Sequence, residues 1–413
     1  MPQDPDSSSA NDIVARQYEA WVYPEPIADL TKAIEDGYGG LTDIPVFGPL
    51  YWPDRRFFDK LDVLVAGCGT NEGAYHAIRN PRCRITAIDV SRASLGHTKY
   101  LKEKHRLDNL EIHLLDLHEV GRLGKQFDLI ISTGVLHHLA DPDAGLRSLR
   151  DVLAPDGVMS LMLYGKTRRH GVYLLQRAFQ LMGLGQTKVD IDIVRRLLDG
   201  IPKNHSVNAY LESANDLAFD AGVVDTFLHP QDRAYAVGEV YDFVETNGLS
   251  FMGWLDRAPY CPRAVISSGE DILSRICRLP EREQAEITDL LSFGSGTHRF
   301  NACLPAHFTR APRITFNSEN FLRYRPAPRF GLRVAQRSDL ASGRPAILER
   351  NGYKVTATLQ EGMLLEQCNG QRRISDILPV LDRFVSLEDD KVAIARRLFA
   401  AMHEMGHFLF STW

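Results

Sequence analysis

The stretch LDVLVAGCGTNEG (residues 61–73) decides the fold of this chain. Its first six residues have the length and aliphatic composition of a strand that is buried on both faces. Gly67 and Gly69 follow at once, and they allow a tight turn and a close approach of the backbone to a ligand. A helix over 72–79 is expected next. This order of strand, glycine-rich turn and helix predicts a βα unit whose turn binds a ligand.

Further strand-like runs continue the pattern along the chain, with helical stretches at 91–106 and 142–153 between them. The runs are RITAID (84–89), LEIHLL (110–115), FDLIIS (127–132), VMSLML (158–163), LSFMGW (249–254) and HRFNACL (298–304). Repeated strand–helix units predict the α/β class, here a doubly wound, Rossmann-like sheet of seven strands. Its ligand site is expected at the carboxyl ends of the strands.

Two acidic residues end strands where a nucleoside would need them. Asp89 ends the second strand, where a carboxylate accepts hydrogen bonds from ribose hydroxyls. Asp116 ends the third strand, where a carboxylate can accept from the exocyclic amine of adenine. The spacing G-x-G-x-x-x-G differs from the G-x-G-x-x-G of dinucleotide binding. These ordered features favour a nucleoside-containing ligand over a purely structural turn.

The chain resembles class I S-adenosylmethionine-dependent methyltransferases over roughly residues 11–305. The resemblance is carried by VLVAGCGTNEG, Asp89, LLDLHE, FDLIISTGVLHHLADP and LRDVLAPDGVMSLMLY. VLVAGCGT and RQYEAWVYP (16–24) are similar to the branch often fused to tetratricopeptide repeats, which are absent here. The resemblance implies S-adenosylmethionine as the cofactor. It also implies that the turn contacts the methionine part, Asp116 and Leu117 contact adenine, and Thr133 and Gly134 lie beside the sulfonium.

The expected cofactor-binding residues are Tyr18, Ala66, Gly67, Cys68, Gly69, Asp89, Val90, Asp116, Leu117, Thr133 and Gly134. Two positions depart from most relatives, which carry an acid at Val65 and glycine at Asn71. The acid helps to hold the cofactor's amino group in those relatives. Here, Tyr18 from an upstream lid or a main-chain carbonyl is expected to replace it.

Methyl transfer is an in-line displacement that requires alignment, exclusion of water and, for some acceptors, removal of a proton. The expected catalytic residues are His137, His229 and Tyr164. An imidazole with a pKa of about 6.5 suits a general base, so either His137 or His138 is a candidate base. The alternative is that this pair positions its loop. His229 lies in DTFLHPQDRAY (225–235), which is either an acceptor loop with Asp225 or an ordinary turn. Upstream aromatic residues form either a cage for the sulfonium or a collar on the sheet: Tyr18, Trp21, Tyr23, Tyr51 and Trp52.

No metal is expected. His403-Glu404-Met405-Gly406-His407 matches the H-E-x-x-H pattern of zinc proteases, which needs both histidines on one helical face and a third ligand. Gly406 is expected to end the helix before His407, and none of the six following residues is a histidine, an acid or a cysteine.

The domain organisation is predicted from shifts in composition. Residues 1–58 are expected to form a disordered tail and an N-terminal lid, and 59–308 the methyltransferase domain, with a helical acceptor-binding insert over about 166–236. A Pro- and Arg-rich stretch, 309–330, is interpreted as a linker. Residues 331–413 are expected to form a small α+β module of winged-helix type, which binds a peptide or makes a homodimer.

The composition limits the partners. Among 413 residues, 48 are basic and 53 acidic, for a net charge of −5, which argues against a nucleic-acid partner. No apolar run approaches the roughly 18 residues of a membrane span, and the first residues do not resemble a secretory signal. Six cysteines without a C-x-x-C pair suggest reduced thiols in a cytoplasmic protein.

The sequence thus predicts a methyltransferase that acts by in-line transfer on a small molecule or a protein side chain. The alternative is a non-catalytic cofactor-binding or regulatory protein on the same fold. A nucleic-acid methyltransferase is disfavoured by the charge balance and by the lack of an Asn-Pro-Pro-Tyr-type motif after the fourth strand.

Overall fold

The computed structural model describes residues 5–39, 42–267, 269–337 and 344–413. The chain forms two compact units. Unit 1 comprises Met1–Asp43, Asp59–Trp254 and Phe293–Phe308, and unit 2 comprises Ile44–Phe58, Leu255–Ser292 and Thr309–Trp413. The sheet region predicted from residue 59 onward lies in unit 1. The predicted C-terminal module lies in unit 2, together with two segments outside that module, 44–58 and 255–292.

Unit 1 is built on a sheet with the strand order β3-β2-β1-β4-β5-β8-β7, and the short β6 also pairs with β5. The strands are β1 (Asp62–Ala66), β2 (Arg84–Asp89), β3 (Leu110–Leu114), β4 (Phe127–Thr133), β5 (Leu153–Gly165), β6 (Ala234–Tyr235), β7 (Ser250–Trp254) and β8 (Thr297–Cys303). Strands β1 to β5 are parallel, and β8 runs antiparallel to β5 and β7. The predicted doubly wound α/β fold is confirmed.

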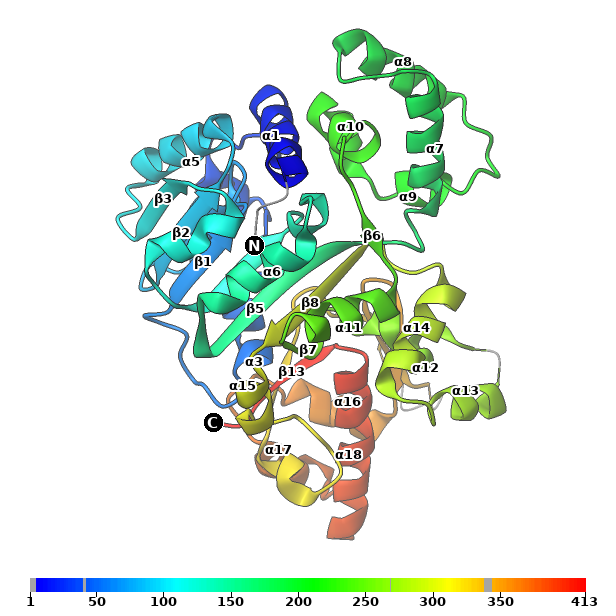
Figure 1. Cartoon of the computed structure of the whole chain (residues 1–413). Helices are drawn as coiled ribbons and strands as arrows, with labels where there is room; N and C mark the ends of the chain where they lie inside the picture. Colours follow the sequence, from blue (N-terminus) through cyan, green and yellow to red (C-terminus); the bar gives the residue numbers. More distant parts are fainter. Residues whose placement is uncertain (1–4, 40–41, 268, 338–343) are drawn as a thin grey trace. The chain divides into compact units, whose positions relative to one another are not determined.

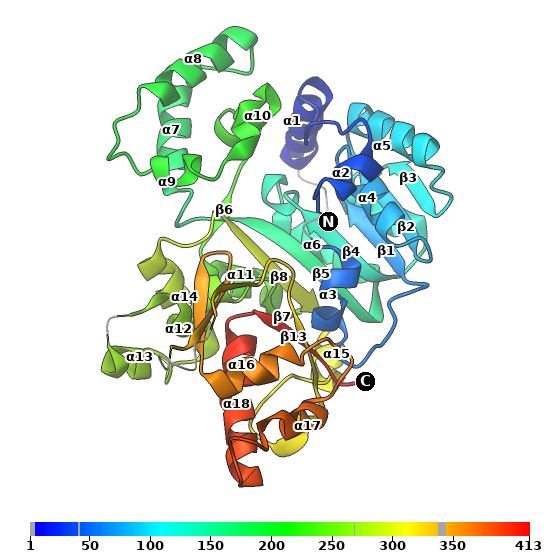
Figure 2. The same ribbon diagram turned by 180° about the vertical axis from the view of Figure 1, so that it is seen from behind.

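Helices cover both faces of this sheet. In Figure 1, α6 (Pro142–Asp151) and α11 (Val237–Thr246) lie on the near face, while α4 (Glu72–Arg79) is seen on the opposite face in Figure 2. Helix α5 (Arg92–His105) packs against β3. The burial explains the sequence pattern: Val63, Leu64 and Val65 of β1 are all at most 1% exposed, so each face of this strand is apolar.

Helices at the carboxyl ends of the strands enclose the predicted site. Helix α1 (Pro5–Ala20) lies between α5 and α10 in both views (Figures 1 and 2), and α2 (Leu30–Glu35) follows it. The insert after β5 contains α7 (His170–Leu181), α8 (Lys188–Asp199), α9 (Asn208–Leu211), η3 (Asn215–Ala218) and α10 (Asp220–Phe227). The insert has a small core of its own, centred on Val172, Phe179, Val194 and Phe227, which makes it a defined wall of the site.

Unit 2 is an α+β structure with two small sheets, β10-β11-β12 and β13-β9. Its elements are α3 (Ile44–Tyr51), η4 (Ala258–Tyr260), α12 (Pro262–Val265), α13 (Glu270–Ile276), α14 (Glu281–Ser292), η5 (Glu319–Arg323), β9 (Arg325–Pro328), β10 (Arg333–Gln336), β11 (Ala346–Arg350), β12 (Tyr353–Ala357), α16 (Leu359–Glu366), α17 (Ile374–Ile377), η6 (Leu378–Leu381), α18 (Glu388–Glu404) and β13 (Phe408–Ser411). Helix α15 (Pro305–Arg310) crosses from one unit to the other. The predicted α+β character is confirmed.

The stretch 309–330 is folded into unit 2 instead of linking two domains. Phe316, Phe321 and Tyr324 are buried in the core of the unit, and β9 pairs with β13 along four residues. The large apolar side chains explain the difference, because burying an aromatic ring outweighs the loop tendency of the neighbouring prolines.

The predicted end of the helix before His407 is confirmed. Helix α18 ends at Glu404, and Gly406 has a φ of +61°, which directs the chain into β13. His403 is on the helix, where the Arg257 Nη1 lies 2.6 Å from its Nε2.

No helix within the described ranges is long and apolar enough to cross a membrane.

The burial of Phe321 yields a stability test. Phe321→Ala should destabilise unit 2 by about 3–5 kcal/mol, the usual cost of removing a buried phenyl ring, because the ring is 0% exposed. Phe330→Ala is the control, since this nearby side chain is 87% exposed. Hydrogen exchange of peptides from 346–410 measures the effect. Equal protection in both variants would contradict the assignment of 309–330 to the core.

Candidate functional site

The glycine-rich turn after β1 is sterically required. Gly67 and Gly69 have φ values of +74° and +52°, in the left-handed region that favours glycine. A Cβ on Gly67 would lie 2.3 Å from Cγ2 of Val135, and one on Gly69 would lie 2.9 Å from the carbonyl oxygen of Tyr23. The turn therefore needs glycine both for its backbone angles and for the close packing of two other segments.

Asp89 is held rigidly beside this turn. Its Oδ2 accepts a hydrogen bond from the Gly69 N–H at 2.8 Å, and its Oδ1 accepts one from the Ser91 N–H at 2.9 Å. Burial raises the pKa of this carboxyl, and the two backbone donors oppose the shift. The carboxylate is therefore preoriented at the carboxyl end of β2, as the predicted ribose contact requires.

Asp116 caps the short helix η1 (Leu117–Leu123). Its Oδ1 lies 2.8 Å from both the backbone N and the Nδ1 of His118, and this hydrogen bond raises the pKa of His118. The structure thus assigns this side chain a capping role, while its predicted contact with adenine stays a prediction. Leu117 is buried directly after it.

The end of β4 has the features of a ligand cradle. The Oγ1 of Thr133 is buried and has no hydrogen-bond partner among the described residues. Gly134 has a φ of +74°, and a Cβ there would meet only Cε of Met162, at 3.5 Å. An orphaned hydroxyl beside an uncrowded glycine fits a bound polar group. Ala66 and Cys68 are buried on the neighbouring β1 turn, and Val90, after β2, is partly exposed.

A segment that we call the strap, residues 18–28, is fastened across the glycine-rich turn. Asn71 donates to the carbonyl oxygen of Glu25 at 3.0 Å and accepts from the N–H of Ile27 at 3.1 Å. The Thr70 hydroxyl donates to the carbonyl oxygen of Pro24 at 2.8 Å. Asn71 therefore holds the strap in place, a role that its sequence position did not reveal.

The strap also reaches the helical insert through Asp225 of α10. This carboxylate is 2% exposed and accepts hydrogen bonds from the hydroxyls of Tyr18, at 2.8 Å, and Tyr164, at 2.9 Å. Burial, followed by the charge of Asp225, raises the pKa of both tyrosines, so both remain protonated donors. The Tyr18 hydroxyl thus binds Asp225, and its predicted contact with the cofactor's amino group stays a prediction.

Two buried histidines, His138 and His229, lie beside this carboxylate, and a third, His137, packs against Tyr164. The His137 ring centroid is 3.8 Å from that of Tyr164, and His138 is 4.3 Å from His137 and 3.9 Å from His229. Burial, followed by the nearby His138, lowers the pKa of His137 and His229, so both are neutral at pH 7. The structure brings together the three predicted catalytic residues with His138 and Asp225, which the sequence also offered as a candidate base and an acceptor contact.

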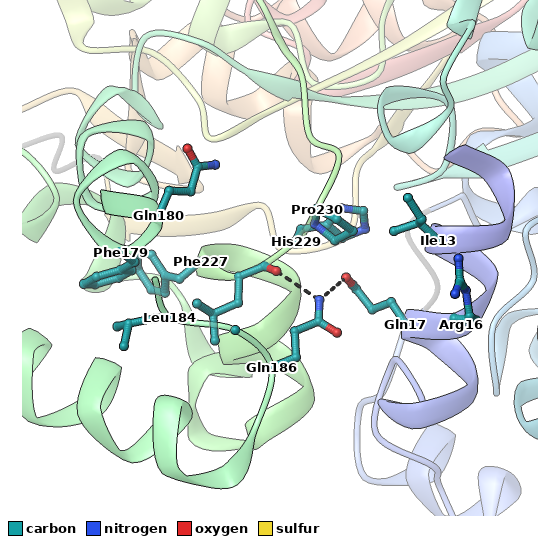
Figure 3. Close-up of a pocket in the computed structure, with 12 residues that line it drawn as sticks. Ile13, Arg16, Gln17, Phe179, Gln180, Leu184, Gln186, Phe227, His229 and Pro230 are labelled. Carbon is teal, nitrogen blue, oxygen red and sulfur yellow. Dashed lines mark hydrogen bonds between the residues drawn. The ribbon is translucent and has the colours of Figure 1, made fainter. Parts of the chain in front are cut away.

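A pocket of about 510 Å³ leads to His229 between α1 and the insert (Figure 3). Phe179, Phe227 and Leu228 give it an apolar wall. The side-chain amide of Gln186 donates to the Oε1 of Gln17 at 2.8 Å and to the carbonyl oxygen of Leu228 at 3.0 Å. Of the histidine cluster, His229 lines this pocket.

Two predicted aromatic residues do not belong to this site. Tyr51 and Trp52 lie in and just after α3 of unit 2, where both are buried and Trp52 stacks on Phe58. These two aromatic residues therefore have a packing role and do not form a cage for the sulfonium. Trp21 is in unit 1, where the Lys188 ammonium lies 5.0 Å from its ring centroid, and Tyr23 donates to Asp216 at 3.2 Å.

Residues 64–159 match the family model of a methyltransferase domain. The match covers the glycine-rich turn, Asp89, Asp116 and the end of β4. This part of the chain is a methyltransferase domain of the class I, S-adenosylmethionine-dependent type. This confirms the family resemblance and the cofactor, whereas the affiliation with the repeat-fused branch stays a prediction.

Relatives of this methyltransferase include an uncharacterised protein of Synechococcus sp., 29% identical over 68% of this chain and 69% of that protein. The tRNA 5-carboxymethoxyuridine methyltransferase of Escherichia coli K12 is 33% identical, but over only 28% of this chain and 43% of that enzyme. The solved structure of PKMT2 from Rickettsia typhi has a TM-score of 0.66 at 14% identity, covering 88% of this chain and 74% of that one. That likeness shows the fold.

The preoriented Asp89 gives a binding test for the methyltransferase. Asp89→Ala should weaken the binding of S-adenosylmethionine about 10- to 100-fold, since a hydrogen bond to a charged group contributes about 1.5–3 kcal/mol. Isothermal titration calorimetry measures the affinity, and circular dichroism checks the fold. Asp108→Ala, at an exposed site before β3, is the control. Unchanged affinity in Asp89→Ala would remove this residue from the cofactor site.

The strap gives a second test. Asn71→Gly removes two hydrogen bonds of about 1 kcal/mol each, so amide exchange of residues 18–28 should accelerate about 10-fold or more. Exchange of β1 should be unaffected. Hydrogen-exchange mass spectrometry measures both segments, with Asn204→Gly, at an exposed site of the insert, as the control. A strap that stays equally protected would show that other contacts hold it.

Proposed function

We propose that this protein transfers the methyl group of S-adenosylmethionine to a primary amine of a small molecule or a protein side chain. The observation that carries the proposal is the buried carboxylate of Asp225, which lies beside two buried histidines, His138 and His229. The pocket that leads to His229 provides the route of entry for the acceptor.

An amine suits this site better than a hydroxyl because of the number of donors it carries. Asp225 and an imidazole offer lone pairs, and a primary amine can supply two or three N–H groups where a hydroxyl supplies one. The rings of Tyr18 and Tyr164 add aromatic faces that favour a cationic group. The carboxylate and the rings together form a site that attracts an ammonium group and can hold it after it loses a proton.

When bound, S-adenosylmethionine supplies a methyl group on a sulfonium, which is electrophilic without further activation. The residues of the chain position the reactants and exclude water. Asp89 and the glycine-rich turn would hold the cofactor, with the orphaned Thr133 hydroxyl beside its reactive end. Tyr18 and Tyr164 fix the direction of the Asp225 carboxylate, and the strap excludes water, which favours in-line attack.

The first experiment is transfer of a labelled methyl group into fractionated extract, with the label traced to small molecules, protein or nucleic acid. The proposal expects acid-stable label on amines of small molecules or protein. Label in RNA would favour instead an RNA acceptor, as for the Escherichia coli relative. The net charge of −5 argues against that outcome. Normal cofactor binding with no transfer would favour a regulatory protein.

The role of Asp225 gives a kinetic test. Asp225→Asn should lower kcat/KM for an amine about 100-fold or more, because a neutral amide no longer balances the ammonium charge, and cofactor affinity should stay within about 3-fold. Asp220→Asn is the matched control, since Asp220 begins the same helix and pairs with Lys188 and Arg195 at the surface. Equal activity of the two variants would remove Asp225 from the acceptor site.

A further inference from the structure

Two stacked histidines are bound by the main chain of a single residue. The rings of His138 and His229 lie 3.9 Å apart with an interplanar angle of 25°. Gln231 contacts both: its carbonyl oxygen lies 3.0 Å from Nδ1 of His138, and its N–H lies 3.0 Å from Nδ1 of His229. The Gln231 side chain also donates to the carbonyl oxygen of His138, at 2.9 Å, which fixes the spacing of the two loops.

These contacts set opposite tautomers on the two rings. A carbonyl oxygen can only accept, so Nδ1 of His138 carries a proton and its Nε2 presents a lone pair. A backbone N–H can only donate, so Nδ1 of His229 presents its lone pair and the neutral ring carries its proton on Nε2. Both Nε2 atoms are buried, and neither has a hydrogen-bond partner among the residues that the structure describes. The pair therefore offers one proton acceptor and one donor.

The same geometry argues against a metal ion. One nitrogen of each ring and one oxygen of Asp225 lie within 4.8 Å of one another, as a set of ligands would. A metal on Nε2 of His229 would need the lone pair there and the proton on Nδ1. The Gln231 N–H occupies the Nδ1 lone pair, so this tautomer would break the backbone hydrogen bond.

We propose that His138 is the general base of the methyl transfer and that His229 is a positioning donor. This inference rests on the proposed function and deepens it. Nε2 of His138 takes a proton from the acceptor ammonium, which frees the nitrogen lone pair. That lone pair forms the new N–C bond while the S–C bond breaks and its electron pair stays on sulfur. The products are a methylated ammonium and S-adenosylhomocysteine, and the proton leaves His138 to solvent.

The surroundings of His138 suit a transient positive charge. The groups that face it are His137, His229, Tyr18, Tyr164 and Asp225. Only the carboxylate among them is charged, and it lies next to the site of proton transfer. The guanidinium of Arg169 lies 3.7 Å from the ring centroid of Tyr164 and is paired with Asp232 at 3.3 Å; its charge contributes to the lowered pKa of His137 and His229.

The tautomers can be measured without turnover. In ¹⁵N-histidine-labelled protein, long-range ¹H–¹⁵N spectra should show His138 protonated on Nδ1 and His229 protonated on Nε2, with His138→Gln and His229→Gln used to assign the signals. Gln231→Ala keeps its main chain and should leave both tautomers intact. The same tautomer on both rings, or loss of both signals to one equivalent of Zn²⁺, would overturn the inference.

Kinetics with an amine acceptor then separate the two roles. His138→Gln should lower kcat about 100-fold or more at pH 7. This loss of kcat should become smaller as the pH approaches the pKa of the free amine, about 10. His229→Gln should raise KM and keep the wild-type pH profile. A pH-independent loss in His138→Gln, or a shifted profile only in His229→Gln, would overturn the assignment. Absence of transfer to any amine by the wild-type protein would overturn the proposed function itself, whatever the tautomers.

Discussion

The enclosure of the site depends on one buried carboxylate, that of Asp225. Removing a charge from water costs several kcal/mol unless hydrogen bonds compensate, and here the compensation comes from the hydroxyls of Tyr18 and Tyr164. These donors are far away in the sequence, one in the N-terminal strap and one at the end of β5. The strap, the central sheet and the insert must therefore meet at one place for the carboxylate to be satisfied.

The same requirement relates the two halves of the reaction. The strap is fastened to the glycine-rich turn by Asn71 and Thr70, on the cofactor side. Tyr18, at the start of the strap, then reaches the acceptor side. Displacement of the strap would at once expose the turn and deprive Asp225 of a donor. Because of this arrangement, Asp225 keeps both of its tyrosine donors only while the strap lies across the glycine-rich turn.

Local patterns predicted the sheet well, because aliphatic runs, glycine-rich turns and the acids that end strands are all visible within a few residues. The acid that ends β2, Asp89, follows from spacing alone, while its contact with a ribose stays a prediction. Contacts between distant segments could not be predicted from local patterns. The hydrogen-bond partners of Asp225 lie 207 and 61 positions away in the sequence. The tautomers of His138 and His229 depend on the main chain of one residue, Gln231. Likewise, the prolines and arginines of 309–330 suggested a linker, while Phe321 and Tyr324 bury that stretch in unit 2.

The most direct measurement is a crystal structure with S-adenosylhomocysteine and an amine acceptor bound. We expect the ribose on Asp89 and the sulfur beside Thr133 and Gly134. We also expect the acceptor nitrogen between the sulfur and His138, within hydrogen-bond distance of Asp225 and in line for transfer. A ligand sulfur that faces away from Asp225 and His138, or an acceptor bound outside the pocket between α1 and the insert, would contradict it.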